Sequence, residues 1–324
     1  MYGLLKKNIT QLIVACLLVG MVTAASAQNK VTKVLVAFPP GGPVDFVART
    51  ISEQLGKELG QTVVVENKPG ANGNVGAELV ARSAPDGYTV LLADIGALCI
   101  SPSVYPKLAF DPVKDFSPVV MVSYSPHVLA VHPSVPVNTV SELIAYAKAN
   151  PERVKQGSSG TGALQHLSGE LMAYQAGVKF THVPYKGGGP ALTDVIAGQI
   201  QVVFATSQTG LPQAKAGRLR VLGVTTPYRI AAEPDLPTIA EAGVPGYEVT
   251  NWHALIGPKG LPRAIVEKLN GELSRFLKAK EMEERFQNDG MSPAPGTPEQ
   301  LAEQIRKEIE LWRQVVQRAG VKLN

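Results

Sequence analysis

The chain has 324 residues, of which 45% are apolar and 18% charged, with 31 glycines and 25 prolines. This length predicts about two domains with substantial apolar cores. The formal net charge is only +4, and Lys and Arg are scattered rather than clustered, so we expect no nucleic-acid partner.

Residues 1–27 have the pattern of a secretory signal peptide. Two lysines precede an apolar run from about residue 12 to 22, and the run leads to Ala25-Ser26-Ala27, a small-residue cleavage site. We therefore expect an exported, periplasmic protein. An uncleaved membrane anchor and a lipoprotein processed at Cys16 stay open as alternatives.

Cleavage would leave Cys99 as the only cysteine, so no intrachain disulfide and no cysteine-based metal site can form. Cys99 lies in the apolar stretch 91–100, which predicts a buried small hydrophobe rather than a nucleophile. We expect no metal and no cofactor.

The first predicted strand, 34–37, leads into the first loop, residues 38–45, and then into a helix with apolar residues at helical spacing up to residue 59. Pro43 suits the first helical turn, and Gly41 and Gly42 can take positive φ and admit a ligand close to the backbone. The free N–H groups of such a helix start favour an anion. We therefore predict ligand contacts from residues that include Phe38, Pro40, Gly41, Gly42 and Asp45.

Asp45 has three open interpretations. Its carboxylate could orient the first loop, bond the ligand through water, or lie there because a helix start favours negative charge.

Predicted strands at 62–66 and 88–93 enclose a predicted helix at 72–82. Alternating strands and helices indicate an α/β layer whose ligand crevice lies at the carboxyl ends of the strands.

Extended segments at 118–122 and 127–131 begin a second set of elements, followed by a helix at 139–149. The second loop, residues 157–162, then repeats the glycine turn before a helix. We predict ligand contacts from this loop and the helix that follows, namely Ser158, Ser159, Gly160, Thr161, Gly162 and His166. The hydroxyl groups could instead cap the turn, and His166 could be a structural histidine.

Further strands are predicted at 201–204 and 220–224, and a crossing strand at 249–257 returns to the first lobe. A long helix starts at Pro262, and Thr297 to Gln300 has the pattern that caps the last helix. The predicted division is 28–124 and 251–324 for lobe 1 and 125–250 for lobe 2. Two crossings allow hinge closure.

Several motifs, in this order, resemble the Bug, or tripartite tricarboxylate transporter (TctC-like), substrate-binding proteins. They are Phe38-Pro39-Pro40-Gly41-Gly42 with Asp45, Val65-Glu66-Asn67-Lys68-Pro69-Gly70-Ala71-Asn72-Gly73, Ala84-Pro85-Asp86-Gly87-Tyr88, His182-Val183-Pro184-Tyr185-Lys186-Gly187, and Pro234-Asp235-Leu236-Pro237-Thr238-Ile239-Ala240-Glu241-Ala242-Gly243. The resemblance covers essentially the whole mature chain.

The resemblance implies a periplasmic-binding-protein-like fold of type II, with two α/β lobes joined by two crossing strands and a ligand cleft between them. It implies that a small carboxylate is held between the first and second loops, and we expect apolar contact from Phe38 and Tyr185. The implied partners are the membrane permease subunits of a tripartite transporter. A sensor that presents its closed form to a membrane kinase is the alternative, and we expect a monomer.

Two positions depart from the family pattern. Ala205-Thr206 stands where many relatives carry an acidic residue, and Asp94 follows a strand where many relatives have small or hydroxyl residues. If Asp94 faces the cleft, it would attract an ammonium group or repel a second carboxylate.

An exported hydrolase is the remote alternative. Gly157-Ser158-Ser159-Gly160-Thr161 lacks the final glycine of the Gly-x-Ser-x-Gly elbow, and the glycines miss the dinucleotide-binding spacing. We therefore expect a binding protein and no enzymatic activity.

Overall fold

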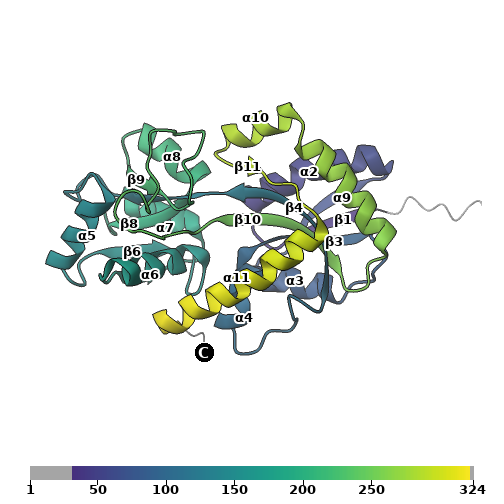
Figure 1. The fold of residues 1–324 in the computed structure, drawn as a ribbon, viewed down its shortest axis with the longest axis horizontal. Coiled ribbons are helices and arrows are strands. Elements are labelled where there is room, and N and C mark those ends of the chain that lie inside the picture. Colours follow the sequence, from purple (N-terminus) through teal and green to yellow (C-terminus); the bar gives the residue numbers. More distant parts are fainter. Residues whose placement is uncertain (1–30, 322–324) are drawn as a thin grey trace, which may run out of the picture.

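The computed structural model describes residues 31–321, which form two α/β lobes side by side (Figure 1). The predicted signal peptide, including Cys16, lies outside the described residues. Within residues 31–321, no helix combines the length and the apolar character needed to span a bilayer.

Lobe 1 is built on a six-stranded sheet. Its first three strands in the sequence are parallel, as expected from their helical connections, and the others are antiparallel to their neighbours. In spatial order the strands are β11 (Ser292–Pro293), β4 (Phe116–Ser125), β10 (Asn251–Pro258), β3 (Thr89–Asp94), β1 (Thr32–Val36) and β2 (Val63–Asn67).

The helices of lobe 1 are α2 (Pro43–Leu59), η1 (Ala71–Gly73), α3 (Asn74–Ala81), η2 (Gly96–Ile100), α4 (Ser101–Val104), α9 (Arg263–Leu277), α10 (Lys280–Asn288) and α11 (Pro298–Ala319). One prediction needs correction. The helix expected over 72–82 begins as a separate 3₁₀ turn, because Asn72 has a positive φ. The long helix predicted from Pro262 is confirmed as α9, and a separate helix, α10, begins at Lys280. The capping box of α11, with Thr297 and Gln300, is confirmed.

Lobe 2 is built on a five-stranded sheet in which parallel and antiparallel pairs are mixed. In spatial order its strands are β7 (Thr181–Pro184), β6 (Lys155–Ser158), β8 (Val202–Thr206), β5 (His127–Val131) and β9 (Arg220–Val224). Its helices are α5 (Val140–Ala149), α6 (Leu164–Ala176), α7 (Gly188–Ile196) and α8 (Ser207–Lys215).

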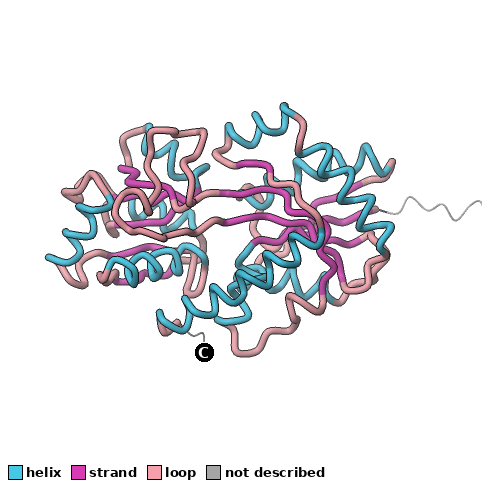
Figure 2. Tube along the Cα trace, viewed as in Figure 1, coloured by secondary structure: helices cyan, strands magenta, loops and turns pink. Residues whose placement is uncertain are grey.

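The chain crosses between the lobes twice, which confirms the predicted fold class. The first crossing runs from β4 through Pro126 directly into β5, and the second leads from β9 back into β10 (Figure 2). β4 and β10 pair in antiparallel register, so the two crossing strands form one ribbon at the hinge. Helix α11 also packs against both lobes, since it contacts β4 in lobe 1 and α6 in lobe 2.

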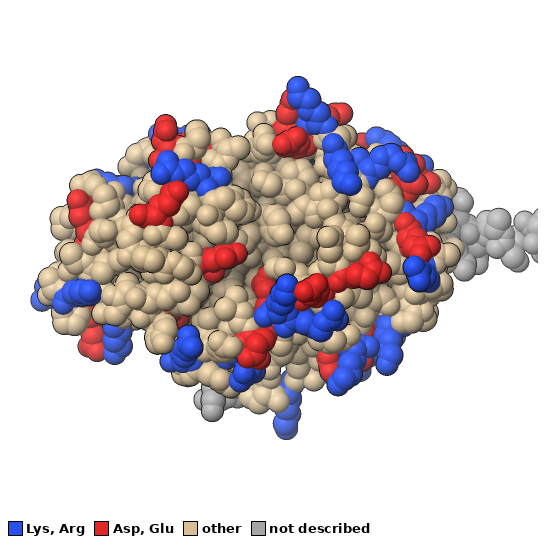
Figure 3. Space-filling view, in the orientation of Figure 1, with Lys and Arg blue, Asp and Glu red and all other residues tan. Residues whose placement is uncertain are grey.

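Apolar side chains fill the space between sheets and helices in three clusters. Cys99 is fully buried in the largest cluster, and its Sγ faces the Ile305 carbonyl of α11, which confirms the predicted packing role. Figure 3 shows both signs of charge scattered over the visible face, consistent with the small net charge.

Candidate ligand site between the lobes

The first loop is held from within by Asp45. One carboxylate oxygen accepts hydrogen bonds from the Gly41 N–H (3.0 Å) and Arg49 Nε (2.8 Å), and the other accepts from Arg49 Nη2 (3.1 Å) and Asn67 Nδ2 (2.9 Å). Burial pushes the pKa of Asp45 upward, but these hydrogen bonds outweigh it and hold the pKa below its usual value. The contacts therefore favour the loop-orienting interpretation of Asp45.

Only one of the two glycines in the first loop takes the predicted backbone conformation. Gly41 has a φ of +82°, whereas Gly42 caps α2 with a φ of −86°. A Cβ at Gly42 would meet only the Pro39 carbonyl oxygen, at 3.7 Å. The expectation of positive φ at Gly42 was wrong, so the backbone shape does not require glycine at this position.

Three turns meet at the carboxyl ends of β1, β2 and β3. A Cβ at Gly73 would lie 3.5 Å from the Phe38 ring and 3.2 Å from Ala97. A Cβ at Gly96 would lie 2.9 Å from Asn72 Oδ1 and 3.1 Å from Asp94 Oδ1. Phe38 and Asp94, predicted from distant parts of the sequence, thus share one edge of the sheet. Asn72, which was not predicted as a site residue, lies beside Asp94.

Asp94 caps the helical segment that follows β3. Its Oδ1 accepts hydrogen bonds from the N–H groups of Gly96 (3.0 Å) and Ala97 (3.4 Å). Burial, only partly offset by these bonds, raises the pKa of Asp94 to about 7.

The second loop uses two of its own amides internally. The Gly160 N–H donates to Ser158 Oγ (3.1 Å), and the Gly162 N–H donates to His166 Nδ1 (3.1 Å). Within residues 31–321 no acceptor faces the N–H groups of Ser159 and Thr161. The second loop therefore offers a ligand fewer amides than its glycine pattern predicts.

The contacts of His166 favour the structural role over the ligand contact, the two roles that the sequence left open. Its ring stacks on His182 with centroids 3.6 Å apart, and its Nε2 lies 3.4 Å from a Glu170 carboxylate oxygen. His182 Nε2 in turn lies 2.6 Å from Ser158 Oγ. Burial and then the neighbouring His166 lower the pKa of His182 to about 4. This histidine pair supports the second loop, and His182 was not among the predicted site residues.

Most of the remaining predicted residues are buried or already bonded to other residues of lobe 2. Tyr185 donates from its hydroxyl to Asp194 Oδ2 (2.7 Å), and burial followed by this bond raises its pKa to about 12. Ala205 is buried in the core of lobe 2, and Thr206 Oγ1 lies 2.9 Å from Thr209 Oγ1 at the start of α8. Pro40 is exposed at the tip of the first loop.

The second loop touches lobe 1 directly. A Cβ at Gly162 would lie only 2.5 Å from Cγ1 of Val104, the last residue of α4. The segment from Asp94 to Val104 therefore links the edge where Phe38 lies with the loop of the other lobe. The two predicted loops therefore both lie near one segment of lobe 1, residues 94–104.

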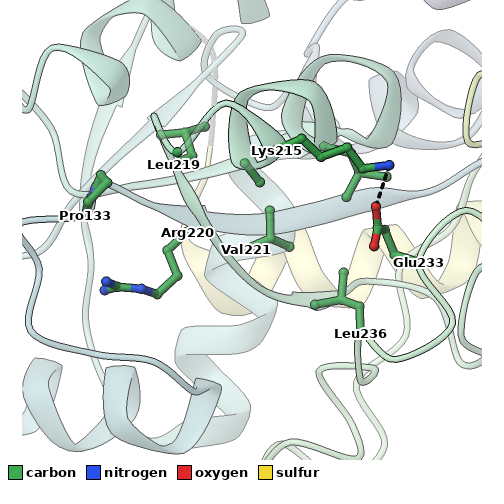
Figure 4. Close-up of a pocket in the computed structure, with 10 residues that line it drawn as sticks. Pro133, Lys215, Leu219, Arg220, Val221, Glu233 and Leu236 are labelled. Carbon is green, nitrogen blue, oxygen red and sulfur yellow. Dashed lines mark ion pairs between the residues drawn. The ribbon is translucent and has the colours of Figure 1, made fainter.

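A separate hollow of about 510 Å³ opens on lobe 2 beside β9 and α8. None of the predicted ligand residues lines it, and its polar rim includes the ion pair between Lys215 and Glu233, 2.8 Å apart (Figure 4). No group of His, Cys, Asp or Glu that could hold a metal is present in residues 31–321.

Two α/β lobes, two crossing strands and a loop of one lobe seated on the other define the class of two-lobed solute-binding proteins. A family model described as the tripartite tricarboxylate transporter family receptor matches residues 47–321. BugT of Bordetella pertussis is 35% identical over 303 residues, which cover 93% of each chain. The chain therefore belongs to this receptor family, as the motifs indicated.

Solved structures agree with this assignment. Rpa4515 of R. palustris, solved with adipate, is 37% identical with a TM-score of 0.85, and the match covers 90% of this chain and 99% of that one. MatC of Rhodopseudomonas palustris, solved with bound malate, is 33% identical with a TM-score of 0.79, covering 88% and 99%.

Proposed function

We propose that the protein captures a small organic acid between its lobes in the periplasm and delivers it to the permease subunits of a tripartite transporter. The observation that carries the proposal is the contact of the second loop with lobe 1. No residue from 31 to 321 accepts a hydrogen bond from the N–H groups of Ser159 and Thr161. Relatives solved with adipate and with malate support a carboxylate as the ligand.

The chemistry is sufficient without a cationic side chain. Each hydrogen bond from an amide to a carboxylate contributes about 1.5–3 kcal/mol, and a micromolar dissociation constant needs about 8 kcal/mol. Two amides supply about 3–6 kcal/mol. Contact with the partly exposed Phe38 ring and the exclusion of water on closure supply the remainder.

Calorimetry against mono-, di- and tricarboxylates, amino acids and aromatic acids tests the proposal. We expect one class to bind, and we expect Gly42→Leu to abolish that binding with the fold retained, because its side chain has room but would block access to the first loop. Gly271→Leu, on α9 with open space around it, is the matched control. Failure of every acid to bind, or unchanged affinity in Gly42→Leu, would contradict the proposal.

A further inference from the structure

One face of the hinge ribbon carries a continuous row of polar residues. Asn251 pairs with Ser125, and His253 pairs with Ser123 on one side and Asp94 on the other. Residues opposite one another, and residues two apart along a strand, share a face of the sheet. We call this row of five residues the polar hinge face.

The opposite face of the ribbon packs against helix α11. Trp252, between Asn251 and His253, donates from its indole Nε1 to Glu308 on α11 (2.8 Å). The polar hinge face therefore points away from α11. Gln208 of lobe 2 reaches it, since its Nε2 donates to Ser125 Oγ (3.4 Å).

The polar hinge face is buried, yet several of its polar atoms lack partners. Asn251 is 7% exposed and Asp94 9%, while His253 is fully buried. Among the described residues no hydrogen bond reaches Asn251 Oδ1, His253 Nε2 or Gln208 Oε1. Asn72 Nδ2, which lies near Asp94, is also buried and has no partner within residues 31–321. Buried polar atoms without partners are costly, so a group of them points to an absent ligand or water.

Two of these unpaired atoms, Asn251 Oδ1 and Gln208 Oε1, can only accept hydrogen bonds. The Asp94 oxygens also only accept when the carboxyl group is ionised. His253 is neutral, because burial lowers its pKa to about 3, and its Nδ1 lies 2.9 Å from Ser123 Oγ. Asp94 is the only acidic residue in the row. A surplus of acceptors around one carboxyl group suits a group that donates several hydrogen bonds.

Resting on the proposed function, we propose that the polar hinge face binds the end of the ligand farthest from its carboxylate, and that Asp94 selects an ammonium group there over a second carboxylate. An ammonium group brings three N–H donors and no acceptor. A carboxylate brings only acceptors and would be repelled by Asp94. The ligand class is therefore small amino acids.

Calorimetry at pH 8, where the Asp94 carboxyl group with its raised pKa of about 7 is mostly ionised, tests the selection with ω-amino acids and dicarboxylates of equal length, three to six carbons. The two series differ only in the distal group. We expect the best amino acid to bind at least about tenfold more tightly than the dicarboxylate of the same length, as expected when one charge pair replaces a charge repulsion. Asp94→Asn should reduce this preference to about twofold or reverse it, since the amide carries no charge.

Asp94→Asn keeps an oxygen that can accept from the Gly96 N–H, so the turn should fold, and thermal unfolding checks this. Asp94→Ser is a second variant with a capping oxygen. Asp235→Asn, an exposed position in lobe 2, makes the same change of charge and should leave the preference unaltered.

The possible outcomes separate the two proposals. Dicarboxylates that bind as tightly as the amino acids, a preference that survives Asp94→Asn, or binding confined to other acids would overturn the selection by Asp94 and leave the solute-binding function standing. Failure of every acid to bind would overturn the proposed function, and the selection with it.

Discussion

Gly162 is the residue through which the second loop contacts lobe 1. Its φ of +76° lies in the region that favours glycine, and a Cβ there would lie 2.5 Å from Val104. Glycine is therefore required at this position for two reasons, because both the backbone turn and the close approach of the lobes exclude a side chain.

We expect Gly162→Ala to lower the free energy of unfolding by about 2–4 kcal/mol, the sum of left-handed strain and overpacking. Gly177→Ala is the matched control, because Gly177 has a similar φ of +63° in open space and should cost only about 1–2 kcal/mol. Urea denaturation measures both. Adding Val104→Ala to Gly162→Ala should restore the part of the stability lost to overpacking and leave the part lost to backbone strain. Equal losses of stability in Gly162→Ala and Gly177→Ala would contradict the contact between Gly162 and Val104.

The positions of both loops could be predicted from local sequence, because glycines followed by a helical pattern mark a turn and a helix start. Their hydrogen-bond partners could not. Asp45 bonds to Asn67, which lies 22 residues away, and His166 stacks on His182. These long-range contacts decide which amides and carboxylates remain available to a ligand.

At the scale of elements, the existence of α11 could be predicted from the sequence, whereas its position could not. The spacing of its apolar residues and its capping box predicted a long helix, and the structure contains one from Pro298 to Ala319. Its position against both lobes was not predictable, because an amphipathic pattern indicates that one face is buried but not what covers it. Arg318, near its end, lies 5.0 Å from the Tyr174 ring of α6 in lobe 2.

Glu308 is the polar anchor of this helix. Its carboxylate accepts from the indole nitrogens of Trp252 (2.8 Å) and Trp312 (3.3 Å), and both rings are buried. We expect Glu308→Ala to lower the free energy of unfolding by about 2–4 kcal/mol, because two buried donors lose their acceptor. Glu308→Gln keeps one acceptor oxygen and should cost about half as much. Chemical denaturation provides the measurement.

Glu310→Ala is the control for this experiment. Glu310 is exposed on the same helix and pairs with Arg313, so its loss should change stability by less than about 1 kcal/mol. An effect of Glu308→Ala no larger than that of Glu310→Ala would show that the indole contacts do not anchor α11.

At the scale of the whole molecule, acid stability is set by buried groups of opposite behaviour. Burial lowers the pKa of His127 and His182 to about 4 and that of His253 to about 3, from 6.5. Histidines with lowered pKa bind protons mainly when unfolded, so stability falls as the pH drops below 6.5. Asp94, with a pKa raised from 3.8 to about 7, binds its proton mainly when folded and has the opposite effect between those values.

Burial also raises the pKa of Glu308, so it acts in the same direction as Asp94. Three histidines against two carboxyl groups still predict a net loss of stability between pH 6.5 and pH 5. Each group contributes at most about 1.4 kcal/mol per pH unit. We expect the loss to become shallower in His253→Gln, which removes a destabilising titration, and steeper in Asp94→Asn, which removes the opposing one. Denaturant unfolding at pH 7, 6 and 5 measures these slopes. Parallel slopes for wild type and both variants would contradict the assignment.

The sequence by itself determined the fold class, most of the strands and helices, the two glycine loops and the family, because all of these depend on local periodicity, turn residues and motifs. Strands β6 and β11 and helices α8 and α10 were not predicted. Only the tertiary structure decided the polar hinge face, the histidine pair and the reach of α11. These depend on strand register and on contacts between residues distant in the chain, for example Asp94 with His253, which are 159 positions apart and meet only when β3 and β10 pair. Local pattern fixes no register between strands, and register decides which polar groups share a face.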